Sequence, residues 1–325
     1  MREHPIVVHL IDDATAGGVT RVVDHILTDD GMAKLGTHHA KQIARGVPRW
    51  QSFDADVIVS HLSISWRNLP VLLAIRAANP GKKLVHIEHS YTEAFVALNV
   101  KKKKRFFNLL KIAYAVFDTI VAVSEGQAAW ISRQGLCSDR KLRVIQSCID
   151  LAPFASLAPR SGEKTVFGAI GRLDRQKGFD TLIKAFRRIE DDDAELRIYG
   201  AGEEEAALRN LAAGDTRIVF CGFANDPLKA YRDVDVVVMP SRWEAYGLVA
   251  IEALTAKRQL ITSDVDGLLD HRMHGARTFR LEQVSDLVCC LRSAKKAEET
   301  RQPAAALAGL LQTRFVSQWR EVLTS

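Results

Sequence analysis

The chain has 325 residues, 47% of them hydrophobic and 26% charged, a balance typical of a globular protein with room for about two domains. Its formal net charge of +6 lies entirely in residues 1–155, which hold 20 Lys and Arg against 14 Asp and Glu, whereas residues 156–325 hold 25 of each sign. This asymmetry argues against a uniform nucleic-acid coat and favours one basic domain that faces an anionic partner.

The N-terminal residues MREHPIVVHLIDD lack the basic head and long apolar stretch of a signal peptide. The longest apolar run, IAYAVFDTIVAV, is interrupted by Asp118 and falls short of the ~20 residues that span a bilayer. The five cysteines include no C-x-x-C pair, so we interpret them as buried thiols in a reducing compartment rather than as disulfides or zinc ligands. We therefore expect a cytoplasmic protein.

Short β-rich runs alternate with helical patterns along the chain. The predicted strands are IVVHLI, DVIVS, KLVHIE, DTIVAVS and LRVIQ, followed by TVFGAIG, ELRIYG, RIVFC, DVVVMP and QLITS. Runs that are apolar throughout are typical of parallel strands covered on both faces. The sequence thus predicts an α/β fold of two doubly wound, Rossmann-like domains facing across a cleft. The first domain looks short, because residues 27–43 replace a fuller strand and helix unit.

The domain boundary is predicted within residues 150–164, where prolines and a glycine interrupt the periodicity. We expect an N-terminal domain over residues 1–155 and a C-terminal domain over residues 156–310. A last helix, residues 311–325, is expected to pack back on the N-terminal domain. Ligands of such sheets bind outside the carboxyl ends of the strands, so the chemistry should lie in the turns that follow them.

The first such turn is AIGRLDRQKGFDTLIKAF, residues 169–186. Arg172 and Lys177 lie between a strand and a helical pattern, flanked by Gly171 and Gly178. A bidentate guanidinium beside a compact ammonium makes a clamp for two linked phosphates. Taken alone, the turn is equally well explained as a solvated loop with incidental cations.

The second is MPSRWEAYGLVAIEAL, residues 239–254. Glu244 and Glu252 are eight residues apart, about 2.2 helical turns, so they would not share one face of a helix. We expect Glu244 in the loop before a helix that starts near residues 246–249, and Glu252 within that helix. Amides at a helix N-terminus favour an anion. The alternative is a capping acid plus a surface acid.

Together, GRLDRQKG and PSRWEAYGLVAIEAL resemble glycosyltransferase family 4 (GT4), the retaining group 1 glycosyltransferases with the GT-B fold. The resemblance extends over most of the chain. AGGVTRVV is similar to the family's N-terminal glycine loop, GAGEEEAAL to its second-strand glycine turn and CGFANDPLKAYRDVDVVVMPS to the following strand, helix and strand. AVSEG followed by VIQSCIDLAPF is similar to the end of its first domain.

The resemblance implies a hexosyltransferase that moves a sugar from a UDP or GDP type donor to a glycan or lipid-linked acceptor in cell-envelope polysaccharide or glycolipid synthesis. Residues 1–155 would form the acceptor-side domain and residues 156–310 the nucleotide-sugar-binding domain. Arg172 and Lys177 would hold the diphosphate and stabilise the leaving group without a metal or other cofactor. Glu244 would contact the donor sugar and Glu252 the ribose. The other implied donor-binding positions are Gly17, Gly18, Gly200, Gly202, Tyr246, Gly247, Leu248 and Val249.

His89, in LVHIEHSYTEAF, stands where this family often carries an active-site histidine. A lone histidine is more often structural, and His86 lies nearby on the same predicted strand. The resemblance places His89 with Arg172, Lys177 and Glu244 in the catalytic set.

The sequence also departs from the family pattern. Ala245 stands where many relatives have glycine, KRQLI (residues 257–261) replaces a GxPV turn, and SCID replaces NGID. These departures keep open a non-catalytic module that binds a sugar nucleotide or a glycan. Asp264 and Asp266 form a D-x-D pair that could hold a divalent ion, but our prediction contains no metal site.

Residues 101–117, KKKKRFFNLLKIAYAVF, place five cations before a helical pattern. One apolar stripe can face the core, and Phe107, Leu110 and Tyr114 form a second stripe beside Lys104 and Lys111. Such a helix can lie on an anionic membrane, here the inner face of the plasma membrane. The predicted membrane-binding residues are Lys101, Lys102, Lys103, Lys104, Arg105, Phe107 and Lys111. The alternative is a solvated lysine cluster. No recognisable motif accompanies the charge to indicate nucleic acid as a partner.

Overall fold

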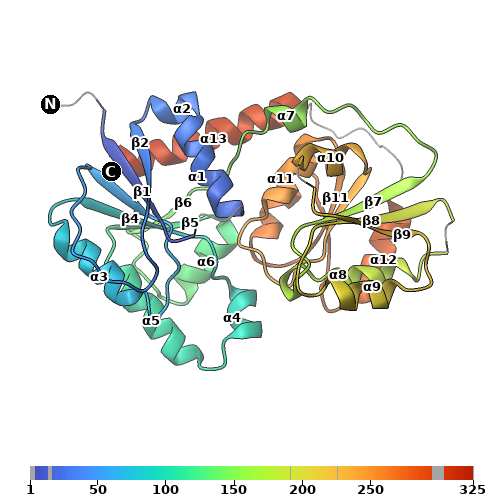
Figure 1. Ribbon diagram of the computed structural model, residues 1–325, viewed down its shortest axis with the longest axis horizontal. Coiled ribbons are helices and arrows are strands. Elements are labelled where there is room, and N and C mark those ends of the chain that lie inside the picture. Colours follow the sequence, from blue (N-terminus) through green and yellow to red (C-terminus); the bar gives the residue numbers. More distant parts are fainter. Residues whose placement is uncertain (1–3, 14–16, 191, 225, 295–303, 325) are drawn as a thin grey trace. The chain divides into compact units, whose positions relative to one another are not determined.

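A computed structural model describes residues 4–13, 17–190, 192–224, 226–294 and 304–324. The chain forms two compact units (Figure 1), unit 1 of Met1–Asp150 with Leu311–Ser325 and unit 2 of Leu151–Leu310. Residues 151–155 thus group with the second unit, and the end of the chain groups with the first.

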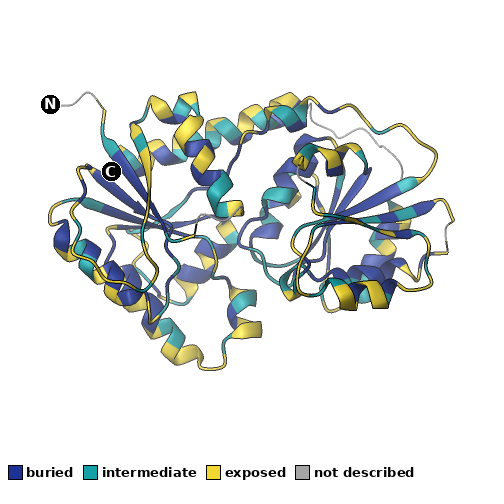
Figure 2. Ribbon diagram, viewed as in Figure 1, coloured by how far each residue is buried: buried dark blue, intermediate teal, exposed yellow. Residues whose placement is uncertain are grey.

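Unit 1 contains a six-stranded sheet in the order β2-β1-β3-β4-β5-β6, in which every described pairing is parallel. Its strands are β1 (Ile6–Ile11), β2 (Thr37–Gln42), β3 (Val57–Ser60), β4 (Lys83–Glu88), β5 (Thr119–Ala122) and β6 (Leu142–Val144). The strands β3 and β5 are buried along their whole length, and β1 and β4 are buried after their first residue, which Figure 2 shows in dark blue. The apolar runs of the sequence reflect this two-sided burial.

Helices cover both faces of this sheet. They are α1 (Gly18–Thr28), α2 (Asp30–Ala33), α3 (Leu69–Ala78), α4 (Glu93–Asn99), α5 (Lys103–Ala115), α6 (Glu125–Arg133) and the last part of α13 (Ala304–Thr324). The main core of unit 1 lies between the sheet and helices α3, α5 and α6. On α13, Phe315, Trp319 and Val322 are at most 1% exposed, so the end of the chain is part of the packed interior.

Unit 2 repeats the arrangement with the strand order β12-β11-β10-β7-β8-β9. Its strands are β7 (Thr165–Ile170), β8 (Ala194–Tyr199), β9 (Ile218–Gly222), β10 (Val236–Met239), β11 (Gln259–Ser263) and β12 (Arg277–Phe279). Its helices are α7 (Ala152–Ala155), α8 (Phe179–Phe186), α9 (Glu205–Ala212), α10 (Pro227–Arg232), α11 (Leu248–Thr255) and α12 (Val284–Ser293), with 3-10 turns η1 (Arg175–Lys177) and η2 (Asp266–His274). Figure 1 shows α8, α9 and α12 on one face of this sheet and α10 and α11 on the other.

Each sheet contains one strand that the sequence analysis missed. Residues 27–43 hold the end of α1, the short helix α2 and the strand β2, so the first domain is not short of a strand. β2 is an edge strand with five of its six residues exposed, and therefore carries no apolar run. β12, also at an edge, has only three residues.

The cysteines also differ from expectation. All five are free thiols, but only Cys148 is buried. Cys221 and Cys289 are exposed, because one lies on the edge strand β9 and the other on the outer side of α12. Within the described parts of the chain, no helix has both the length and the hydropathy that crossing a membrane requires.

Candidate active site

Three turns meet at the carboxyl edge of the sheet in unit 2. The strand order β10-β7-β8 places the turn after β7, residues 171–178, between the turn after β8, residues 200–202, and the segment after β10, residues 240–247. Parallel strands end at the same edge, so these three segments become neighbours although they are far apart in the sequence.

The backbones of these turns touch through glycines. A Cβ atom on Gly200, whose φ is +144°, would lie 1.8 Å from the Gly171 carbonyl oxygen. One on Gly202 would lie 2.4 Å from the Leu173 carbonyl oxygen, and one on Gly178 would lie 2.1 Å from that of Pro240. Glycine is therefore required for packing at these positions. The donor contacts predicted for Gly200 and Gly202 remain predictions.

Lys177 and Glu244 form an ion pair within this group of turns. The Lys177 Nζ atom lies 2.6 Å from Glu244 Oε2, and the two side chains are only 17% and 13% exposed. The Ser241 hydroxyl donates to the same carboxylate oxygen at 3.4 Å. Since an ammonium has three N–H donors, Lys177 can hold Glu244 and still donate to a second anion.

Arg172 is much more open. Its side chain is 75% exposed, with a guanidinium nitrogen 3.3 Å from Asp174 Oδ2 and a second contact to Gln176 Oε1 at 3.5 Å. The Gln176 amide in turn donates to the Trp243 carbonyl at 3.1 Å. Gln176, to which the sequence analysis gave no role, thus ties the turn after β7 to the segment after β10.

The helix α11 begins where the sequence predicted. Gly247 precedes it with φ +91°, Glu244 lies in the loop ahead, and Glu252 lies within the helix. The carbonyl of the buried Tyr246 accepts a hydrogen bond from His271 Nε2 at 2.8 Å. Burial lowers the pKa of His271 to about 4, so the ring is neutral near pH 7. This contact fixes the start of α11, whose first amides point to the same edge of the sheet.

Glu252 stands apart from the other predicted site residues. Its side chain is buried, with the residue 2% exposed, and its carboxylate accepts a hydrogen bond from the Tyr231 hydroxyl of α10. A ribose hydroxyl could reach this carboxylate only by replacing or joining Tyr231. The predicted ribose contact of Glu252 remains a prediction with this added condition.

Both aspartates of the D-x-D pair, Asp264 and Asp266, accept hydrogen bonds from backbone amides. Asp264 Oδ1 accepts from the Leu281 amide at 3.2 Å, and Asp266 Oδ2 accepts from the Glu244 amide at 3.4 Å. The backbone of Asp266 has a φ of +41°, a conformation that residues other than glycine rarely adopt. This residue contacts Glu244 through the hydrogen bond just described. Across the described ranges of the chain, no three His, Cys, Asp or Glu side chains are grouped so that they could hold a metal ion.

In unit 1, His89 directly follows β4 at the carboxyl edge of the sheet and is partly exposed. Its Nε2 atom lies 2.9 Å from His61 Nδ1. Burial lowers the pKa of His89 to about 4, against an opposing effect of Glu88. Gly17 and Gly18 lie at the start of α1, which follows β1 at the same edge, and the order β1-β3-β4 separates them from His89 by one intervening strand.

The basic segment of unit 1 differs from the prediction. Residues 101–105 and Lys111 are exposed, as expected of surface cations. Leu110 and Tyr114 are fully buried, however, and Phe107 packs against Trp130 with its ring centroid 6.5 Å away. The second apolar stripe is therefore core, because α5 is covered over a wider arc than one stripe. Ile112, which is 45% exposed, is a large apolar side chain on the outward side of this helix.

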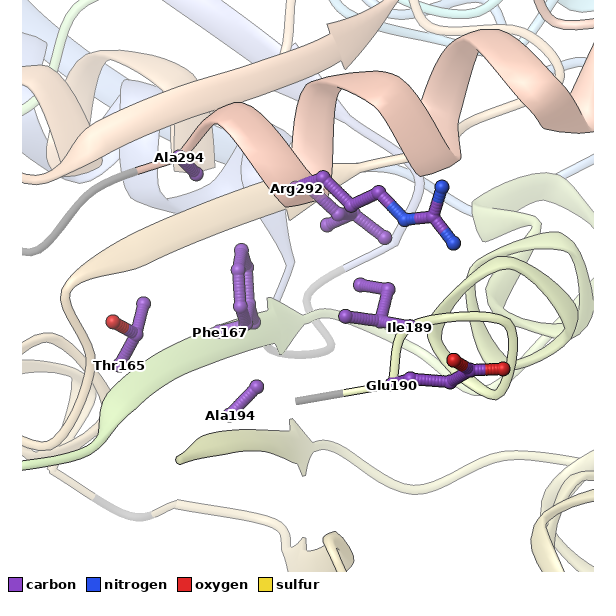
Figure 3. A pocket seen from close by; sticks show the side chains of 8 residues that line it. Thr165, Phe167, Ile189, Glu190, Ala194, Arg292 and Ala294 are labelled. Atoms are coloured by element: carbon purple, nitrogen blue, oxygen red, sulfur yellow. The ribbon is translucent and has the colours of Figure 1, made fainter. Parts of the chain in front are cut away.

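A pocket in unit 2 lies away from these turns. It holds about 400 Å³ and is lined by residues that include Thr165 and Ala194, the first residues of β7 and β8. Figure 3 shows its side chains, among them Phe167 of β7 and Arg292 of α12. It therefore opens at the amino ends of the strands, the opposite edge from the glycine turns. Two of its lining residues, Glu190 and Ala294, are followed in the sequence by residues outside the described ranges. We assign this pocket no role.

Comparison with known proteins agrees with the motifs. Residues 6–153 match the description Glycosyltransferase Family 4, and residues 164–293 match Glycosyl transferases group 1. The chain belongs to glycosyltransferase family 4. A phosphatidyl-myo-inositol mannosyltransferase of Mycobacterium leprae is 36% identical over 232 residues, which is 68% of this chain and 58% of that protein. The aligned parts span 33% to 61% of the first curated relatives, so they leave much of those proteins unmatched.

Solved structures show that this family 4 chain has the GT-B fold. Sucrose-phosphate synthase from Thermosynechococcus elongatus matches with a TM-score of 0.75 at 18% identity, over 98% of each chain. The Anabaena protein HepE, determined in complex with UDP and glucose, matches with a TM-score of 0.72 at 16% identity, over 99% of this chain and 100% of that one. At such identities the likeness concerns the fold.

We predict that Gly200→Ala lowers the free energy of unfolding of this family 4 protein by more than about 2 kcal/mol. The added methyl group meets the Gly171 carbonyl and also requires a backbone conformation unfavourable by about 1–2 kcal/mol for other residues. Gly214→Ala is the matched control, because Gly214 also has a positive φ, +86°, but nothing within 4 Å of the added atom. Chemical denaturation should give a loss of about 1 kcal/mol for the control. Equal losses in the two variants would show that the contact between the turns is unimportant.

Proposed function

We propose that the protein is a retaining glycosyltransferase that moves a sugar from a nucleotide diphosphate sugar to a hydroxyl group of a lipid or lipid-linked glycan. The observation that carries the proposal is the Lys177 and Glu244 ion pair, held by backbone contacts at the carboxyl edge of a nucleotide-binding type of sheet. Family membership supports a transferase, and the solved complex of HepE with UDP and glucose supports a nucleotide-sugar donor. The Mycobacterium relative, a phosphatidyl-myo-inositol mannosyltransferase, supports a lipid acceptor.

In the proposed reaction, the bond between the sugar and the diphosphate breaks and negative charge develops on the leaving phosphate. Lys177 donates to this phosphate, and the exposed Arg172 moves onto it to form a bidentate contact. The two positive charges, one held in place and one that moves onto the phosphate, can supply the stabilisation that a divalent ion gives in other transferases. The amides that start α11 also favour the phosphate or the sugar.

Glu244 has two tasks in this proposal. It orients Lys177 through the 2.6 Å contact before the donor binds, and its carboxylate then accepts hydrogen bonds from the donor sugar. The acceptor hydroxyl attacks on the face from which the diphosphate leaves, so the configuration of the sugar carbon is retained. The leaving phosphate takes the proton of the acceptor hydroxyl. His89 is placed near the sugar by the family resemblance.

The donor base is tested by thermal denaturation in the presence of UDP, GDP, ADP, CMP and TDP, with and without EDTA. We predict that one nucleoside diphosphate raises Tm by several degrees regardless of EDTA, and that Arg172→Ala removes most of the shift. Arg209→Ala, which removes a 51% exposed cation paired with Glu205 on α9, is the control and should retain the shift.

The outcomes of this screen distinguish the candidate functions. A diphosphate that binds without sugar transfer to any offered acceptor would favour the non-catalytic module, whose support is Ala245 and the altered segment 257–261. A shift that EDTA abolishes would contradict the metal-independent mechanism. No shift with any nucleotide would contradict the assigned donor site.

We predict that Lys177→Met lowers kcat on the order of a hundredfold or more, because a preorganised positive charge on the leaving group is lost. It also leaves the Glu244 carboxylate without its ammonium partner, at a cost of about 1–3 kcal/mol in stability. The double variant Lys177→Met with Glu244→Gln should recover much of this stability but none of the activity. Initial rates and denaturation curves of both variants test this. Near-normal turnover in Lys177→Met would contradict the clamp.

Membrane binding belongs to the same proposal, with the cations of residues 101–105 as its basis. We predict that the protein floats with anionic vesicles and not with zwitterionic ones, and that adding salt reverses the binding. Each cation near the surface contributes about 1 kcal/mol to membrane binding. Replacing all four lysines at positions 101–104 with Gln should therefore lower the partition coefficient between anionic vesicles and water at least about a hundredfold. Ile112→Ser should have a smaller effect, since a single partly exposed side chain is removed. Equal flotation with both vesicle types would contradict the electrostatic anchor.

A further inference from the structure

Four histidines form a row across neighbouring strands of unit 1. His38 lies on β2, His9 on β1, His61 directly after β3 and His89 directly after β4, and the sheet order is β2-β1-β3-β4. His38 Nδ1 lies 3.0 Å from His9 Nε2, and His9 Nδ1 lies 3.0 Å from His61 Nε2. His61 Nδ1 lies 2.9 Å from His89 Nε2. These are hydrogen-bond distances, so the four rings are connected in series.

The bonding pattern couples the four rings. A neutral imidazole has one N–H donor and one acceptor nitrogen, and both nitrogens of His9 and of His61 are engaged. All N–H groups in such a series must point the same way, toward His89 or toward His38. The tautomer of His89 is therefore set together with those of the other three rings.

The surroundings of the row favour neutral rings. His9 is fully buried and His61 is 7% exposed, while Trp319 of α13 packs edge-on with its centroid 5.7 Å from His9. Burial lowers the pKa of His9 to about 3 and that of His61 well below its usual value. Burial also lowers the pKa of His38 to about 4.

The charged and titratable neighbours of the row are few. Glu88 raises the pKa of His89, whereas His86 lowers the pKa of both His89 and His61. At the other end, the Met32 carbonyl raises the pKa of His38 and His39 lowers it. Burial outweighs these opposing effects at each ring, so the whole row is uncharged near pH 7.

We propose that His38, His9 and His61 act as positioning residues for His89. They hold it as a neutral imidazole with Nε2 bonded to His61, and leave Nδ1 as the nitrogen that meets the substrate. This inference rests on the proposed function, which places His89 near the transferred sugar. A sugar hydroxyl can donate to or accept from Nδ1, whichever direction the row takes. The row therefore couples the hydrogen-bonding role of His89 Nδ1 to the direction of the series, and leaves the ring uncharged.

The first test reads the histidines directly. Long-range proton to nitrogen NMR spectra of the full chain, labelled with ¹⁵N-histidine and assigned by single substitutions, report charge and tautomer at each ring. We expect the row to remain neutral and in single tautomers from pH 8 down to about 5. His61→Phe should leave His89 in a mixture of its two tautomers, because Nε2 loses its partner, while burial keeps its pKa below the ordinary value of about 6.5. His89 titrating near this value in the unmodified protein would overturn the proposal.

His25→Gln is the matched control for the spectra. His25 is also buried in unit 1, but it bonds to Gln312 at 2.8 Å and lies outside the row. Its substitution should leave the signals of His61 and His89 unchanged. Should His61→Phe not fold, His9→Gln interrupts the same row one ring further from His89 and serves the same comparison.

The second test uses transfer kinetics. In His61→Phe we expect kcat to fall on the order of tenfold to a hundredfold, with the KM for the donor little changed. The pH profile of this variant should stay close to that of the unmodified protein, because burial still keeps His89 neutral. His61→Asn, which keeps a polar group near the Nδ1 position, should recover part of kcat.

The two tests separate the inference from the proposed function. A loss of kcat in His61→Phe with His89 signals that still report a single tautomer would show that His61 acts only in packing, and would overturn the inference. If the protein transfers no sugar at all, the proposed function fails, while the spectra still decide whether the row controls the tautomer of His89.

Discussion

The parallel pairing of β7 with β8 and β10 determines where the candidate site residues of unit 2 lie. Neighbouring strands are about 4.8 Å apart, so the turns that leave them at one edge must share a narrow space. Glycines at positions 178, 200 and 202 make this possible, because a Cβ atom there would overlap a carbonyl of the adjacent turn. Lys177 and Glu244 are 67 positions apart in sequence and meet as a direct result.

The resulting ion pair is well suited to binding an anion. Both side chains are largely buried, so their positions are fixed before a ligand arrives, and the cost of ordering them has been met during folding. Arg242 adds a second link, since it bonds to Asp180 at 2.8 Å and its amide donates to the Gln176 carbonyl at 2.7 Å. Arg172 differs from Lys177 and Glu244, because its side chain is 75% exposed and can move onto a ligand.

Unit 1 uses the same topology for different chemistry. Its net positive charge includes the exposed cations of residues 101–105, whereas the edge of its sheet that carries His89 presents neutral imidazoles. The cations that we propose to meet an anionic surface and the histidine that we propose to contact the sugar are thus carried by different elements of one unit. Burial is the physical cause, because removing a histidine from water disfavours its charged form, while an exposed lysine retains its charge.

Much of this protein can be predicted from its sequence. The two parallel sheets follow from runs such as VVVM in β10, because strands covered on both faces must be apolar throughout. The glycine turns, the place of Glu244 before α11 and that of Glu252 within it also follow from local patterns. Edge strands β2 and β12 do not, since an edge strand needs little apolar surface and leaves no run to detect.

Other features were decided only by the tertiary structure. Tyr231 reaches Glu252 from another helix, and the four histidines come from four segments whose order in the sheet is not written in any local pattern. The inner position of Leu110 and Tyr114 likewise depends on how much of α5 its neighbours cover. Spacing along the chain determines which residues share a strand, a turn or a helix face, because those relations are set by local backbone geometry. Which strands become neighbours, and therefore which distant side chains bond, depends on the packing of the whole sheet.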